Sequence, residues 1–198
     1  MTANTATGRI ATGVRLRLPE SWLEIDPRVA DLSGEIVRAL AGHGADTAGD
    51  GTVAQAVDPL VTELRRLSAR TDVLLAGFYS DFVDGGPDAV QVFTANVTIA
   101  LSPQIQDGAR VRAEIEREAV AEGLESGVHA LSGGPTLTTW GRGQLVRGGI
   151  EVFTRRFHVP VPGLDQVAVL AFGTPNVDFA AEFDELFVSI ADTFRFVG

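Results

Sequence analysis

The chain has 198 residues, a formal net charge of −10 and no cysteine. It is long enough to bury a core without disulfides, and the missing thiols exclude thiol catalysis and thiolate metal sites. The acidic charge disfavours nucleic acid or an anionic membrane surface as the main partner, and because all 16 basic residues are arginine, Schiff-base chemistry is excluded.

The composition, with 45% hydrophobic and 21% charged residues, is typical of a globular protein. No apolar run is long enough to span a bilayer, and the first residues lack the apolar centre of a signal peptide. We therefore expect a cytoplasmic protein, with a disordered tail at residues 1–8 and a single α+β domain at residues 9–198.

The first third of the chain predicts one strand and two helices. Apolar and polar residues alternate over residues 10–18, which predicts a half-buried strand. Asp26 is expected to cap a helix whose apolar residues recur at helical spacing and which a glycine at position 42 or 44 ends. Residues 52–70 predict another helix, which either bends at Pro59 or begins there.

The middle of the chain predicts a hairpin followed by a helix. Residues 72–83 and 90–101 read as two antiparallel strands joined by a glycine-rich turn. Residues 109–127 predict an acidic amphipathic helix whose apolar side includes Val111, Ile115 and Ala119.

The last third predicts three strands and a closing helix. Residues 135–146 and 150–161 flank Gly148-Gly149, a pair typical of a two-residue hairpin turn, and residues 165–173 form the last strand. A final helix capped by Asp178 would continue through Phe194 and pack its phenylalanine-rich face on the sheet through Phe183, Phe187 and Phe194. Together these elements indicate an α+β fold, with a mostly antiparallel sheet of about five or six strands and helices packed on it.

The two ends of the chain also suggest a family. The segment "LRLPESWLEID" near the start and "VAVLAFGTPNVDFAAEFDELFVSIADTFRF" near the end resemble the Mog/PsbP-like superfamily, especially its uncharacterised actinobacterial members. The resemblance implies a layered sandwich of an antiparallel sheet and helices, used mostly for binding. One branch of that superfamily binds a Ran GTPase, and another stabilises the oxygen-evolving centre of photosystem II. Bacterial branches include lipoproteins, but this chain lacks the cysteine that lipidation needs.

The histidines do not suggest a metal centre. His43, His129 and His158 lie far apart in the sequence and have no other ligand type at metal spacing. We place His43 and His129 in glycine-rich loops and His158 in a strand. No catalytic motif is present, so we expect no enzymatic activity, no cofactor and no metal.

One pair of arginines invites a binding hypothesis. A two-residue turn at Gly148-Gly149 would place Trp140 opposite Phe157 and Arg142 opposite Arg155. Like charges that face each other are unfavourable. The pair is tolerated if both arginines reach water, if an internal Asp or Glu lies between them, or if they hold an anion or acidic partner. Trp140, Arg142 and Arg155 are therefore the candidate binding residues.

The function that these observations favour is a non-enzymatic protein-binding or scaffold domain, whose partner and oligomeric state the sequence does not name. Two alternatives stay open. One is a small-molecule binder or enzyme with a cavity between sheet and helices, and the other is an accessory or immunity-type protein of a secretion system. A deep polar cavity with convergent titratable groups would favour an enzyme, whereas an apolar surface patch would favour a partner-binding domain.

Overall fold

A computed structural model describes residues 13–27, 29–36, 65, 72–84, 90–102, 108–131, 134–144 and 151–197. The predicted helix at residues 52–70 lies outside these residues except for Arg65, which is helical. The predicted tail, His43 and the Gly148-Gly149 turn also lie outside them.

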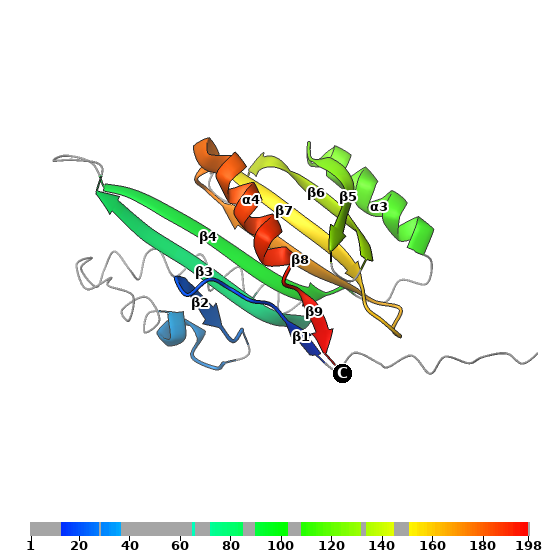
Figure 1. Ribbon diagram of the computed structural model, residues 1–198, viewed down its shortest axis with the longest axis horizontal. Coiled ribbons are helices and arrows are strands. Elements are labelled where there is room, and N and C mark those ends of the chain that lie inside the picture. The colour runs from blue at the N-terminus through cyan, green and yellow to red at the C-terminus, as the bar shows by residue number, and fades with distance from the viewer. Residues whose placement is uncertain are drawn as a thin grey trace, which may run out of the picture.

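The fold is built on a seven-stranded sheet in which every neighbouring pair is antiparallel (Figure 1). The prediction of a mostly antiparallel sheet in an α+β arrangement is therefore confirmed. In spatial order the strands are β2 (Trp22–Ile25), β3 (Asp72–Asp84), β4 (Val90–Leu101), β8 (Val167–Thr174), β7 (Glu151–Pro160), β6 (Gly134–Gln144) and β5 (Glu125–Leu131).

The sheet has more strands than predicted because two edge strands were missed. The edge strand β2 has four residues, too few for alternation to be recognised. At the other edge, β5 contains a glycine and charged residues and was interpreted as part of a helix and a loop. His129 therefore lies in a strand, and its prediction as a loop residue is wrong.

A second, two-stranded sheet joins the two ends of the described chain. Strand β1 (Gly13–Arg15) pairs with β9 (Arg195–Val197), so the long first strand predicted over residues 10–18 is short where it is described. The final helix was predicted to continue through Phe194, but it ends at Ala191 and the chain turns into β9. Figure 1 shows β1 and β9 side by side, just beyond the end of that helix.

Helix α4 (Ala180–Ala191) covers one face of the large sheet and closes the main core (Figure 1). Phe187 is completely buried and stacks against Phe172 and Phe153, with ring centroids 5.0 and 6.4 Å apart. The predicted packing of Phe183, Phe187 and Phe194 on the sheet is confirmed, because all three are buried in this cluster.

The start of α4 differs from the prediction. Asp178 lies inside a short 3-10 helix, η2 (Val177–Phe179), and does not cap α4. The turn is anchored by hydrogen bonds to the sheet instead. The Thr94 amide donates to Asn176 Oδ1 at 2.8 Å, and the Thr174 hydroxyl donates to the Thr94 carbonyl at 2.6 Å. These contacts fix the position of α4 over the sheet.

The opposite face carries helix α3 (Gly108–Ala121), which packs on β5 and β6. Residues 32–36 are helical as well and pack in a second apolar cluster with Ile25 and Ala76. That helix begins after Asp31, whose carboxylate accepts the Gly34 amide at 3.0 Å, so the predicted cap at Asp26 is wrong. No helix within the described ranges is long and apolar enough to cross a membrane.

Candidate functional site

The predicted register of the β6–β7 hairpin is wrong by two residues. Trp140 lies opposite Arg155, and Arg142 lies opposite Phe153. A shift of two residues keeps each side chain on its predicted face. Trp140, Arg142 and Arg155 therefore share one face, and it is the face that α4 covers. The observed register brings the Arg155 guanidinium over the Trp140 ring, with 4.5 Å between Cζ and the ring centroid.

Arg155 has a carboxylate partner within the chain. The residue is 8% exposed, and Nη1 donates to both carboxylate oxygens of Asp184 on α4 at 3.2 Å. The sequence left three explanations for the arginine pair: solvation, an internal acidic residue, or a bound anion or acidic partner. For Arg155 the structure shows the internal acidic residue, which is Asp184. Arg142 is exposed and donates from Nη2 to the Val177 carbonyl at 3.1 Å. Both arginines thus tie the η2–α4 segment to the sheet.

Burial dominates the electrostatics of this ion pair. It lowers the pKa of Arg155 and raises the pKa of Asp184, and the attraction between the two charges opposes both shifts. Removing only one partner would leave the other charge in a poorly solvated place. The pair is therefore a costly but specific link between α4 and β7.

We expect Asp184→Ala to lower the free energy of unfolding by about 2 kcal/mol, because it leaves the Arg155 guanidinium buried without its carboxylate. Glu185→Ala is the matched control, since Glu185 is exposed on the same helix. Urea unfolding of both variants measures the difference. Equal stability of the two variants would contradict this account of Arg155.

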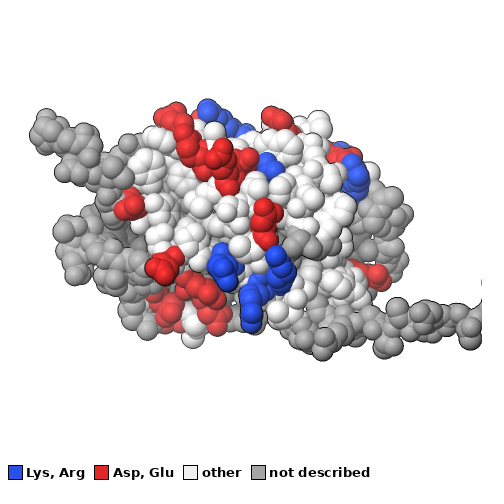
Figure 2. All heavy atoms as spheres, in the orientation of Figure 1, with Lys and Arg blue, Asp and Glu red and all other residues white. Residues whose placement is uncertain are grey.

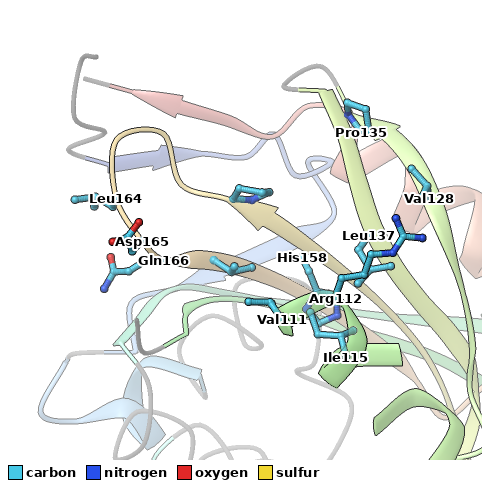
Figure 3. A pocket seen from close by; sticks show the side chains of 12 residues that line it. Val111, Arg112, Ile115, Val128, Pro135, Leu137, His158, Leu164, Asp165 and Gln166 are labelled. Atoms are coloured by element: carbon cyan, nitrogen blue, oxygen red, sulfur yellow. The ribbon is translucent and has the colours of Figure 1, made fainter. Parts of the chain in front are cut away.

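A groove lies on the other face of the sheet, between α3 and the turn that joins β7 to β8 (Figure 3). Its cavity volume is about 380 Å³. Figure 3 shows Leu164, Asp165 and Gln166 at one end and the side chains of α3, β5 and β6 at the other. The lining is mostly apolar and consists of Val111, Arg112, Ile115, Val128, Pro135, Leu137, His158, Pro160, Leu164, Asp165, Gln166 and Val167.

His158 lies in β7, as predicted, and forms part of the groove wall. Its Nε2 is buried and has no hydrogen-bond partner among the residues that the structure describes. Burial, followed by the nearby Arg156 charge, lowers the pKa of His158 to about 4. The ring is therefore neutral at pH 7, and this pKa is far from the value near 7 that suits a general acid or base in neutral solution.

The rim of the groove exposes apolar surface. Val128 is 57% exposed and Leu164 is 40% exposed. Within the described chain, β5 has only β6 as a neighbour, so its other side is an open sheet edge. Apolar side chains and open backbone groups thus lie next to each other.

Comparison with protein-family models and with curated proteins finds no match for this chain. Within the described ranges, no group of three or more His, Cys, Asp or Glu side chains could hold a metal ion.

The structure brings together residues that the sequence did not connect. No pattern in the sequence connects Asp184 with Arg155, which lie 29 residues apart. Val128 was missed because β5 was not recognised, although Val128 and Ala130 alternate with polar neighbours. Without β5, no sequence signal indicated a groove between α3 and the sheet.

Proposed function

We propose that this chain is a non-enzymatic protein-binding domain that holds an extended apolar segment of a partner protein along β5 and in the groove below α3. The observation that carries the proposal is the continuity of this groove with the open edge of β5, at the exposed side chain of Val128. An extended segment can pair with such an edge through its backbone.

The chemistry of the groove favours binding of this kind. A segment paired with β5 would direct every second side chain toward the α3 side, next to Val128. A valine or leucine buried there would contribute roughly 1.5–3 kcal/mol of transfer free energy. The backbone hydrogen bonds would add affinity with little dependence on sequence, and the apolar lining would select the side chains.

The arrangement of layers supports a wider relationship. An antiparallel sheet with helices on both faces is compatible with the layered sandwich of the Mog/PsbP-like superfamily, and we propose that this chain is a distant member. Members of that superfamily act mostly through binding, which agrees with a scaffold or accessory role.

The test uses a short labelled peptide of alternating valine and threonine, with fluorescence anisotropy as the readout. We expect Val128→Glu to weaken binding of the peptide by about tenfold or more. The substitution removes apolar contact with the peptide, and a loss of about 1.4 kcal/mol of apolar burial corresponds to a tenfold loss of affinity. Val120→Glu is the control, since Val120 is exposed on α3 but does not line the groove. A peptide with proline at alternate positions should not bind, because it lacks the amides that pair with β5.

Small-molecule binding remains a second candidate because a volume of about 380 Å³ is within the usual range of ligand pockets. Arg112 lines the groove and donates from Nε to Glu116 of its own helix at 2.8 Å, and its remaining guanidinium donors could take a carboxylate. The test of this candidate is binding of a medium-chain fatty acid. If the protein binds the fatty acid but not the peptide, and if Val128→Glu and Arg112→Gln both abolish fatty-acid binding, small-molecule binding would replace the protein-binding proposal.

A further inference from the structure

The face that carries α4 also carries a cluster of arginines that the groove does not involve. The β1–β9 pairing places Arg15 directly opposite Arg195. Figure 2 shows blue side chains gathered over β1 and β9, although the chain as a whole has a net charge of −10. Like charges at directly opposite positions of an antiparallel pair are unfavourable, so this arrangement has an electrostatic cost.

These arginines surround a hollow of about 360 Å³. It is lined by Arg15, Arg17, Asp192, Thr193 and Arg195. The three guanidinium groups outnumber the single carboxylate, and that carboxylate is already engaged, since Asp192 Oδ1 lies 3.1 Å from His129 Nε2. The hollow is therefore a local excess of positive charge.

Part of the wall is held in place by hydrogen bonds. Arg195 Nη1 donates to the carbonyls of Asp192 and Phe194 at 2.8 and 2.6 Å. The Thr193 hydroxyl donates to the Ile190 carbonyl at 2.7 Å and accepts the Arg17 amide at 2.9 Å. These contacts fix Arg195 at the end of α4, where a cation also offsets the negative end of the helix dipole.

The other two guanidinium groups are available for a ligand. Arg15 and Arg17 are exposed, and neither has an acidic partner among the residues that the structure describes. A guanidinium offers a planar set of donors that matches a carboxylate or phosphate. Two such groups beside a fixed third one form a suitable site for anionic groups.

We propose that Arg15, Arg17 and Arg195 form a docking site for acidic side chains of a partner protein. The surroundings favour a short acidic segment over a long polyanion. Figure 2 shows acidic side chains over the neighbouring helix α4, where Glu182 and Glu185 are exposed, and these would repel an extended nucleic acid. The site is on the opposite face from the groove below α3 and does not depend on the function proposed for that groove.

The experiment measures binding of a labelled oligoglutamate peptide to the full chain at low salt. We expect Arg15→Gln together with Arg17→Gln to weaken binding by about tenfold or more, and we expect added salt to weaken binding to the unaltered protein, because exposed charges are screened. Arg195 is left unchanged because its backbone hydrogen bonds support the end of α4. Arg117→Gln is the control, since Arg117 is exposed on α3 and pairs with Glu114.

The outcomes distinguish the proposal from its alternatives. Oligoglutamate binding that the double variant loses and Arg117→Gln keeps would support it, provided that the melting temperatures of all three proteins agree. No binding at low salt, or equal binding to the variants, would overturn it. Binding of inorganic phosphate without binding of the peptide would also overturn it, because the site would then serve a small anion.

Discussion

Phe187→Ala is expected to lower the free energy of unfolding by about 3–5 kcal/mol, the usual cost of removing a fully buried phenylalanine. The Phe187 side chain lies between α4 and the sheet. Its ring centroid is 5.7 Å from that of Phe183 on the same helix and 5.0 Å from that of Phe172 on β8. Its removal would leave a cavity at the junction of three elements. Chemical denaturation with a fluorescence or circular dichroism readout measures the loss.

The matched control is Phe179→Ala, at the last residue of η2, directly before α4. Phe179 is only half-buried and packs edge-on against Phe93, with centroids 4.9 Å apart, so its truncation should cost clearly less. If Phe187→Ala unfolded at the same denaturant concentration as the unaltered protein, α4 would not close the core as described. Its phenylalanine face would then become a candidate partner surface.

The second large effect is loss of stability in acid caused by His158. The pKa of this ring is about 4 in the folded chain and 6.5 in the unfolded chain, so above pH 6.5 the ring is neutral in both states. As the pH falls below 6.5, the unfolded chain takes up a proton that the folded chain does not, and unfolding becomes more favourable. The loss should reach about 3 kcal/mol near pH 4 and then level off.

Other groups also titrate in acid, so the test compares variants. His158→Leu should remove this part of the loss of stability between pH 6.5 and 4. Arg156→Gln should remove a smaller part, because the Arg156 charge is the second cause of the lowered pKa, after burial. An NMR titration gives the ring's pKa directly, and a midpoint near 6.5 would show that His158 is solvated.

The two candidate surfaces differ in chemistry and in position. The groove below α3 is apolar and continues to a sheet edge, whereas the hollow at β1–β9 is cationic and lies beside α4. Because the two binding tests use different probes and different variants, failure of one proposal would leave the other intact.

Long and regular sequence patterns were sufficient to predict two parts of the fold. Alternation over residues 72–83 and 90–101 predicted the β3–β4 hairpin, and Val97 and Ile99 lie in the core as that alternation requires. Helical spacing of phenylalanines predicted the buried face of α4. In both cases the pattern is local, because the apolar residues of one element define the face that it turns toward the core, and no other part of the chain is needed to recognise that face.

The short strands, the register of β6 and β7 and the charged sites depend on contacts between segments that lie far apart in the sequence. Strands β2, β5 and β9 are too short or too polar for periodicity to show, and they form because another strand offers them an edge. The same holds for the charges. Asp184 reaches Arg155, and Arg15 lies opposite Arg195, because packing joins segments distant in the sequence, and no local pattern encodes such a pairing.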